Sequence, residues 1–289
     1  MTVSGVLNVL KPPGLTSHDV VAYLRKLTGE RRAGHTGTLD PLAAGVLPVC
    51  LGKATRLAEY LAAAAKDYRA EMILGLTTDS GDTEGHVLSR RDAGSIRAPE
   101  LERALAAFRG EIRQVPPALS AVKVDGLRSY QRVRQGIPVE PTVRTVAVYR
   151  LELVEFLPGS SSRARLDIGC SKGTYVRSLC RDIGEALGCG AALGWLLRTR
   201  SGRFRLEEAW TLEELAAGWQ DALVSPAQAV DHLPFVRVSG MDAYRVRHGQ
   251  APQMSVDGHG PVRVLDDDEG LVAMGEVTEG RLKLRKVLV

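Results

Sequence analysis

The sequence predicts an α+β fold, because segments with helical and strand patterns follow one another without the strict alternation of a doubly wound sheet. The chain has 289 residues, of which 44% are hydrophobic and 25% charged, as in ordinary globular proteins. That length is enough for one large domain, or for one large and one small domain. Beyond Asp231 the pattern changes to short strands separated by turns, which indicates a small β barrel or sheet. We therefore predict a main domain of residues 1–231 and a small β domain of residues 232–289.

Hydrophobic periodicity and stop signals predict the N-terminal elements. "GVLNVL", residues 5–10, is typical of a buried strand, and "KPPG" ends it with a turn. Ser17 is expected to cap the next helix. One face of that helix is apolar and consists of Val20, Val21, Leu24 and Leu27. A glycine-rich loop follows, then a strand at residues 45–52 and a helix at residues 53–65.

The middle of the chain predicts three further strands and two further helices. The strands are expected at residues 67–76, 146–156 and 163–171, and the first helix at residues 98–110, with Gly110 near its end. The second helix is expected to begin at Thr174, which is a good N-cap. Its apolar stripe consists of Val176, Leu179, Cys180, Ile183 and Leu187.

Residues 115–145 resist assignment to regular structure. They contain five basic residues, two acidic residues and four prolines, with only a short helix-like piece around Tyr130. A basic segment of this length with so little packing inside a domain is usually functional.

Charge is unevenly distributed along the chain, although the net charge of +4 is modest. Residues 160–205 contain nine Lys or Arg and three acidic residues, whereas residues 206–221 contain five acidic residues and no base. A basic block beside an acidic one suggests a surface that faces a polyanion and a solvated back. An idle charged surface is the alternative.

Several protein classes are disfavoured by what the sequence lacks. No run approaches eighteen apolar residues and the N-terminus lacks the order of a signal peptide, so we expect a cytoplasmic protein. The four cysteines (Cys50, Cys170, Cys180 and Cys189) form no CxxC pair, which favours reduced, buried thiols over a metal site. Phosphate-loop, dinucleotide, metalloprotease and nucleophile-elbow motifs are also missing, so no cofactor is implied.

The stretch "RRAGHTGTLDPLAAGVLP", residues 31–48, is the first candidate for chemistry. Asp40 precedes a proline, which favours an extended backbone, and three glycines allow the chain to fold tightly around it. A carboxylate on such a loop is a plausible nucleophile or general base, and an Asx-turn or capping role is the structural alternative. His35 is an acid–base partner, a nucleic-acid contact or a loop histidine without a role.

The second candidate is "CSKGTYVRSLCRDIGEALG", residues 170–188. Arg177 falls in the first turn of the predicted helix, where the helix dipole disfavours a cation by up to about 1 kcal/mol. A carboxylate or phosphate partner would explain this position, and a solvent-facing arginine is the alternative. Lys172 adds basic character nearby.

Four segments carry a resemblance to a known family. "RAGHTGTLDPLAAGVLPVCLGKATR" resembles the catalytic motif of the bacterial tRNA pseudouridine-55 synthases, the TruB-type family, and matches GHxGxLDPxAxGxLP without a break. "KPPGLTSHDVV" is similar to the N-terminal motif of that family, "PPALSAVKVDGLRSYQRVRQG" to its RNA-binding insertion, and "SKGTYVRSLCRDIGEALGCGA" to its later active-site motif. The resemblance covers Lys11 to Ala192 in family order.

The resemblance implies a fold and an activity. The fold would be that of the pseudouridine synthases: a mixed, mainly antiparallel sheet flanked by helices, an RNA-binding insertion at residues 115–145 and a PUA-like C-terminal β domain. The activity would be the isomerisation of uridine 55 in the tRNA T loop to pseudouridine, by base flipping and an Asp nucleophile, without a cofactor or metal. The implied partner is the tRNA T arm, with no obligatory protein partner, and the default state is a monomer.

The resemblance also implies roles for individual residues. Asp40 would be the nucleophile, with Arg177 paired to it, and Tyr68 would stack on the target base as a candidate proton acceptor. Leu196 would pack near the base, with Leu197 as the one-residue alternative. The other implied positions are His35, which would insert into the RNA, and Lys11 and Pro12, which would buttress the site.

The basic residues of the insertion and of the block at residues 160–205 are expected to contact RNA phosphates, Lys123, Arg132 and Lys172 among them. The sequence departs from the family pattern at Leu10, where Asp or Asn is common. Two other functions remain open: a guide-RNA-dependent relative that works in a ribonucleoprotein, and a non-catalytic RNA-binding or tRNA-folding protein. The developed insertion favours the stand-alone enzyme over the first of these.

Overall fold

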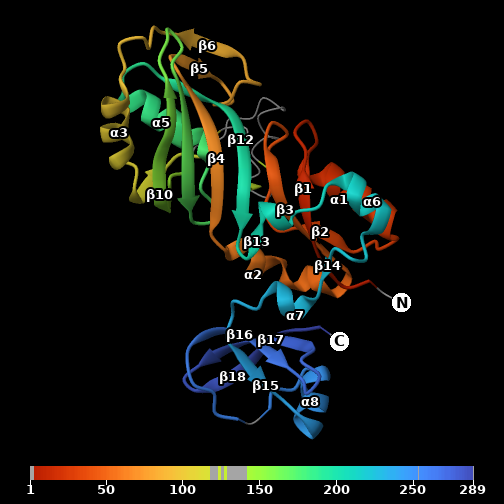
Figure 1. Cartoon of the computed structure of the whole chain (residues 1–289). Coiled ribbons are helices and arrows are strands. Elements are labelled where there is room, and N and C mark those ends of the chain that lie inside the picture. The colour runs from red at the N-terminus through yellow and green to blue at the C-terminus, as the bar shows by residue number, and fades with distance from the viewer. Residues whose placement is uncertain (1–2, 118–122, 125–126, 129–141, 253, 289) are drawn as a thin grey trace.

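The computed structural model describes residues 3–117, 123–124, 127–128, 142–252 and 254–288. A large sheet forms the upper part of the molecule, and a separate four-stranded sheet lies at the C-terminal end (Figure 1). Helices and strands do not alternate regularly along the chain, so the predicted α+β class is confirmed.

The large sheet has the strand order β14-β1-β3-β12-β4-β11-β10-β7, with β2 paired to β3 and β13 paired to β12. Its pairings among the described strands are antiparallel except that between β3 and β12, which confirms the expected mixed, mainly antiparallel sheet. The strands are β1 Gly5–Lys11, β2 Ala33–His35, β3 Ala44–Leu51, β4 Lys66–Leu74, β7 Gly110–Gln114, β10 Arg144–Leu157, β11 Arg163–Cys170, β12 Ala191–Ser201, β13 Phe204–Arg205 and β14 Leu223–Val224.

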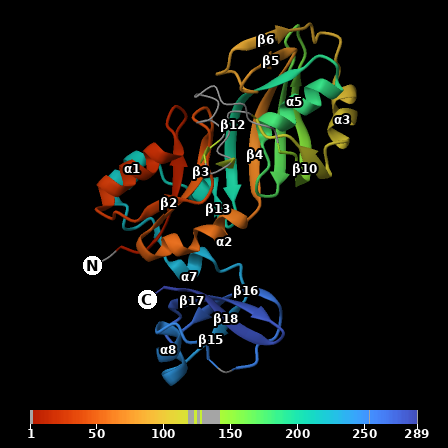
Figure 2. The same ribbon diagram turned by 180° about the vertical axis from the view of Figure 1, so that it is seen from behind.

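Helices flank the two ends of this sheet. Helices α3 and α5 pack beside β10 and β12, and α1 and α6 pack near β1 and β2 (Figures 1 and 2). The helices are α1 Ser17–Thr28, the 3-10 helix η1 Gly52–Leu57, α2 Ala58–Ala63, α3 Ala98–Ala106, α5 Val176–Ala186, the 3-10 helix η2 Leu206–Glu208, α6 Leu212–Gly218 and α7 Pro226–Ala229. In the described part of the chain no helix is both long enough and apolar enough to cross a membrane.

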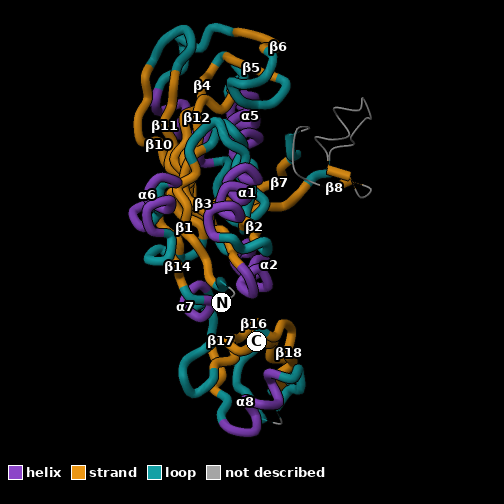
Figure 3. Tube along the Cα trace, turned by 90° about the vertical axis from the view of Figure 1, so that its right-hand side faces the viewer, coloured by secondary structure: helices purple, strands orange, loops and turns teal. Residues whose placement is uncertain are grey.

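Two short hairpins extend from the main body. Strands β5 Leu76–Thr78 and β6 Val87–Arg90 pair at one end of the sheet. Strands β8 Lys123–Val124 and β9 Leu127–Arg128 pair within the predicted insertion, and Figure 3 shows β8 beyond β7, apart from the main sheet.

The starts of two helices differ by one residue from the prediction. Thr16, not Ser17, is the N-cap of α1: its side chain accepts from the Asp19 amide in a capping box, while Ser17 is the first helical residue. Tyr175, not Thr174, is the N-cap of α5, because the Thr174 hydroxyl donates instead to the Ser171 carbonyl at 3.0 Å. Both side chains that were expected to cap are used to hold loops of the site described below.

Other segments differ because tertiary packing overrides local propensity. The helix predicted at residues 53–65 is split into η1 and α2, and the helix predicted at 98–110 ends at Ala106, so that Gly110, with φ +82°, begins β7. Strand β12 was not predicted, because "AALGWLLRTRS" runs through the middle of the sheet and has no alternating polar pattern.

The C-terminal sheet has the order β15-β16-β17-β18, formed by Phe235–Arg237, Gly260–Leu265, Leu271–Thr278 and Arg281–Val287, with helix α8 Gly240–Arg247 beside it. It has its own apolar core, but Met274 and Leu288 also pack with Val6, Val46 and Leu57 in a second cluster. The short strands expected beyond Asp231 are therefore present as a four-stranded sheet, which is packed against the main body. The boundary at residue 231 stays a prediction.

Candidate active site

The loop between β2 and β3 carries Asp40. Lys11, the last residue of β1, and Ser17, the first residue of α1, hold this loop in place. The Ser17 hydroxyl accepts from the Leu39 amide at 2.8 Å and donates to the Leu39 carbonyl at 3.0 Å. The Lys11 ammonium donates to the Ala43 carbonyl at 2.6 Å and to the Pro12 carbonyl at 2.8 Å. Because these bonds fix the residues on both sides of Asp40, the carboxylate projects from a defined backbone.

The glycine at the start of β3, just after this loop, is required for steric reasons. Gly45 has φ +111°, and a Cβ at this position would lie 2.2 Å from the Arg198 carbonyl oxygen. The parallel pairing of β3 with β12 places Gly45 opposite Arg198, so the two backbones are in direct contact. Only glycine fits both the backbone angle and the space.

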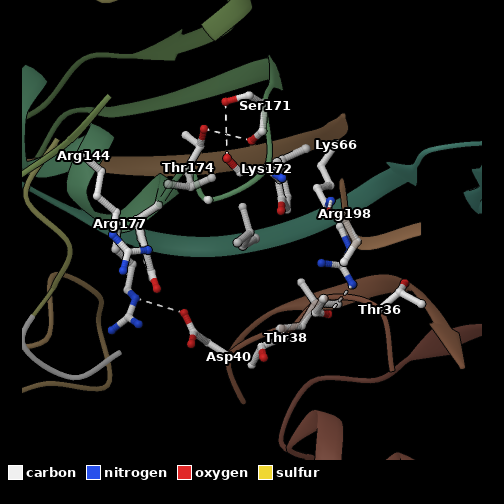
Figure 4. Close-up of a pocket in the computed structure, with 18 residues that line it drawn as sticks. Thr36, Thr38, Asp40, Lys66, Arg144, Ser171, Lys172, Thr174, Arg177 and Arg198 are labelled. Atoms are coloured by element: carbon white, nitrogen blue, oxygen red, sulfur yellow. Dashed lines mark hydrogen bonds and ion pairs between the residues drawn. The ribbon is translucent and has the colours of Figure 1, made fainter. Parts of the chain in front are cut away.

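Asp40 forms an ion pair with Arg177, from the first turn of α5. Arg177 Nε lies 3.0 Å from Asp40 Oδ2, and Arg177 Nη1 lies 3.4 Å from Asp82 Oδ2 (Figure 4 shows the Asp40 pair). Nη1 also donates to the Ser80 carbonyl at 3.0 Å. The side chains of Arg177 and Asp82 are each 6% exposed, whereas that of Asp40 is 38% exposed. The buried arginine therefore bridges a buried carboxylate and one that opens into a pocket.

Opposing effects act on the ionisation of Asp40. Burial raises the pKa of the Asp40 carboxyl above its ordinary value, and the Asp82 carboxylate acts in the same direction. The guanidinium of Arg177 and the ammonium of Lys11 lower that pKa. The anion of Asp40 is consequently held in a weakly solvated place by two nearby cations.

The pocket beside Asp40 has a volume of about 320 Å³. Its lining combines the Asp40 loop, the facing strands β4 and β12 and the turn before α5 (Figure 4). The lining side chains include Asp40, Tyr68, Leu196 and Arg177, with the cations Lys66, Arg144, Lys172 and Arg198 around them. The pocket thus offers one carboxylate, an aromatic and aliphatic floor, and a cationic surround.

Tyr68 and Leu196 come from neighbouring strands. Tyr68 on β4 is directly opposite Arg198 on β12, and Leu196 is opposite Ala70. Tyr68 and Leu196 are each 8% exposed and both line the pocket, while Leu197 is not among the lining residues. Burial raises the pKa of the Tyr68 hydroxyl, and the neighbouring Arg198 guanidinium opposes this shift.

The structure brings together five of the ten predicted site residues: Asp40, Tyr68, Lys172, Arg177 and Leu196 all line the pocket. Lys11 and Pro12 lie behind the Asp40 loop, where Lys11 is fully buried. His35 ends β2 beside the pocket residue Thr36 but does not itself line the pocket. Arg132 lies outside the described residues, as does the side chain of Lys123, whose backbone forms part of β8.

Sequence reasoning missed three buried polar residues of the site: Asp82, Arg198 and Lys66. Asp82 follows β5 in a polar turn that gives no spacing signal. Lys66 donates to the carbonyls of Ala62 and Ala64, each at 2.6 Å, and burial lowers its pKa to about 8. The sequence offered one signal for Lys66, because in "KDYRA" it lies two residues before Tyr68.

This arrangement suits chemistry on an anionic substrate that carries a flat ring. The ring would stack on Tyr68 and pack against Leu196, and the oriented Asp40 carboxylate would reach an atom at its edge. Among the described residues no group of three or more His, Cys, Asp or Glu could hold a metal ion, and all four cysteines are free and buried.

Comparisons with known proteins agree on one family. Residues 25–176 match the model of the TruB family pseudouridylate synthase N-terminal domain, and residues 177–232 match the tRNA pseudouridylate synthase B C-terminal domain. The tRNA pseudouridine synthase B of Symbiobacterium thermophilum is 54% identical over 86% of this chain and 83% of its own length. That of Pseudomonas putida is 44% identical over 99% of this chain and 96% of its own length.

Solved structures show the same likeness. A Cbf5–Nop10–Gar1 complex contains a chain with a TM-score of 0.76 and 32% identity, which covers 99% of this chain and 85% of that one. An H/ACA RNP bound to a substrate RNA containing 2′-deoxyuridine gives a TM-score of 0.75 and 30% identity with the same coverage.

Proposed function

Since the chain belongs to the TruB family of pseudouridylate synthases and is an isomerase that acts on tRNA, we propose that it converts uridine 55 of the tRNA T loop to pseudouridine, with Asp40 as the catalytic carboxylate. The observation that carries this proposal is the Asp40–Arg177 ion pair at 3.0 Å, set in one pocket with Tyr68 and Leu196.

The reaction breaks the bond from N1 of uracil to C1′ of ribose and rejoins the base through C5. The T-loop base must first leave its stack, at a cost of a few kcal/mol. In the proposed site, Tyr68 provides a stacking surface for the extruded base, worth roughly 1–3 kcal/mol. The pocket of about 320 Å³ is large enough for a uracil ring.

Asp40 would act where charge develops as the glycosidic bond breaks. Positive charge grows on the ribose and negative charge on the base, and an ionised carboxylate can add to the sugar or stabilise its charge. Arg177 keeps Asp40 oriented and favours its ionised form. The proton that C5 loses on rejoining goes to a base, for which Tyr68 is the candidate, and N1 gains one, so the reaction is balanced as an isomerisation.

Docking of the RNA would use the basic residues around the pocket. Lys172 and Arg144 line it, and Lys123 and Arg132 of the insertion are proposed to contact phosphates farther along the arm. Removing the charge at Lys123 and Arg132 should weaken RNA binding and flatten its dependence on salt, because fewer counterions are released. An unchanged salt slope would place the RNA on another face.

The test is tritium release from an unmodified T-arm RNA that carries tritium at uracil C5. Wild type and the matched control Asp221→Asn, an exposed position just after the C-terminal end of α6, should release tritium. Asp40→Asn should bind the RNA but release none. Binding without release by the wild type would support a non-catalytic RNA-binding protein instead.

The likeness to a Cbf5–Nop10–Gar1 complex favours one alternative, an enzyme that works only with protein and guide-RNA partners. The curated relatives at 54% and 44% identity are each named tRNA pseudouridine synthase B. We propose the stand-alone enzyme, acting as a monomer, for this chain. Turnover of bare tRNA by the purified chain would exclude the partner-dependent alternative, and turnover only after partners are added would establish it.

A further inference from the structure

Arg198 is a fully buried cation at the junction of the three segments that carry the site. It is 1% exposed and lies on β12, where this strand pairs with β4 on one side and with β3 on the other. Its Nε donates to the Val46 carbonyl of β3 at 2.7 Å, and its Nη2 donates to the Gly37 carbonyl of the Asp40 loop at 3.0 Å. In Figure 4 the Arg198 side chain points towards the loop that bears Thr38 and Asp40.

The same guanidinium reaches the aromatic floor of the pocket. Tyr68 is the direct cross-strand neighbour of Arg198, and both side chains line the pocket, so they share one face of the sheet. The positive charge of Arg198 also acts on the Tyr68 hydroxyl and lowers its pKa, against the effect of burial. One planar group therefore touches the loop that bears the carboxylate and the strand that bears the aromatic ring.

A purely structural role would not require a charge at this position. None of the ion pairs within the described residues includes Arg198, and its two backbone acceptors are neutral carbonyls. Other cations lie close: Lys66 from β4 and Lys11 from β1 both interact with it electrostatically. A buried charge without a carboxylate partner is costly, and a neutral side chain would pack there at lower cost.

We propose that Arg198 is a positioning residue for catalysis, which holds the Asp40 loop in register with the strand that bears Tyr68. This inference rests on the proposed function, since it assigns a task to the same pocket. The five donors of a guanidinium lie in a fixed plane, which allows one side chain to bind two carbonyls at set angles. A lysine keeps the charge but cannot bind both carbonyls in that geometry.

The test compares Arg198→Met, Arg198→Lys and the matched control Arg200→Met in the tritium-release assay, with RNA affinity and thermal melting measured in parallel. Arg200 is on the same strand and pairs with Asp67 at 2.7 Å, away from the pocket lining. Arg198→Met should lower kcat about 100-fold, as expected for misplaced reacting groups, while KM and RNA affinity stay close to wild type. Arg198→Lys should recover part of kcat, and Arg200→Met should keep it.

The pH profile separates positioning from mere support of the fold. The groups that face Arg198 and titrate are Tyr68 and Lys66 from β4 and Lys11 from β1, with Cys170 of β11 beside Tyr68 and Lys66. Loss of the Arg198 cation raises the pKa of Tyr68, Lys66 and Lys11, so the alkaline inflection of kcat should move to higher pH in Arg198→Met but stay in place in Arg198→Lys.

Three outcomes would overturn the proposal: near-normal kcat in Arg198→Met, a loss of kcat that only follows the loss of folded protein, or an alkaline inflection that does not move. If Arg198→Met fails to fold, Arg198→Lys is the test: it should show a lower kcat than wild type at unchanged KM. A kcat equal to that of wild type refutes the proposal. Wild type and Asp40→Asn are run in the same assay. If the wild type releases no tritium, the proposed function itself has failed, which is a different result from failure of the role of Arg198.

Discussion

Replacing Arg177 by lysine tests whether the geometry of its ion pair, beyond its charge, supports the reaction. The Nε atom of Arg177 lies 3.0 Å from Asp40, while its Nη1 atom contacts both Asp82 and the Ser80 carbonyl. A lysine ammonium is a single point charge and cannot occupy both places. It should stay with the buried Asp82 and retreat from Asp40, which is the more exposed carboxylate.

The magnitude follows from Coulomb's law. With an effective dielectric constant of about 20, the attraction at 3.0 Å is about 5.5 kcal/mol, and at about 5 Å it is about 3.3 kcal/mol. The difference of about 2 kcal/mol corresponds to roughly 40-fold in the balance between ionised and protonated Asp40. Because the Asp40 side chain is 38% exposed, solvent screening reduces this to about 1 kcal/mol, or roughly fivefold.

The sign of the pH effect is fixed by the chemistry. Asp40 must be ionised to act, and a weaker cation raises the pKa of its carboxyl, so the acid limb of kcat should move to higher pH in Arg177→Lys. The assay is tritium release across a pH series, with Arg181→Lys as the control. Arg181 lies one turn farther along α5 and pairs with Asp182 at 2.7 Å. An acid limb that stays in place, with near-normal turnover, would refute the reasoning.

Three further predictions concern the residues around this pair. Gly45→Ala should lower the free energy of unfolding by about 3 kcal/mol, because Gly45 has φ +111° and an added Cβ would lie 2.2 Å from the β12 backbone. Gly34→Ala is the control: an added Cβ there meets no atom within 4 Å, so the free energy of unfolding should change by less than about 0.5 kcal/mol. Urea denaturation measures both variants. Burial lowers the pKa of the Lys11 ammonium from 10.5 to about 8, so the unfolded chain holds the Lys11 proton more tightly than the folded chain does. The free energy of unfolding should therefore rise between pH 8 and 10.5. Lys11→Met should flatten that rise in the same measurement. Asp82→Asn removes a like charge that raises the pKa of Asp40, so the acid limb of kcat should move to lower pH, and a move to higher pH would contradict this account.

Most strands could be predicted from the sequence because their apolar residues are consecutive or alternate, as in the strand at residues 5–10, which is β1. Two helix starts were wrong by one residue because the hydroxyl that was expected to cap each helix bonds a loop instead. Thr16 caps α1, which frees the Ser17 hydroxyl for the Leu39 backbone, and no local pattern ranks these two uses. Strand β12 was missed because a strand covered on both sides needs no polar alternation.

The candidate site shows the same division. Two features of the site could be found from the sequence: the motif that contains Asp40, and the unusual cation Arg177 in the first turn of a helix. Their ion pair at 3.0 Å explains why this cation lies in the first turn. Asp82 and Arg198 could not be found in that way, because their partners Arg177 and Val46 are far away in the chain. Lys66 could not be found either, because its place in the pocket follows from the arrangement of the folded strands. Their residue types alone are common on protein surfaces.

The sequence by itself determined the family resemblance, the fold class and the identity of the candidate carboxylate, since these depend on residue types at fixed spacing within short segments. Only the tertiary structure decided how Asp40 is held and charged: β12 lies between β3 and β4, which brings Arg198 against both the Asp40 loop and Tyr68. Long-range strand order has no local signal, because the free energy that selects it comes from burial and pairing of segments far apart in the chain. The electrostatic environment of the site, which depends on that order, could therefore be obtained only from the folded molecule.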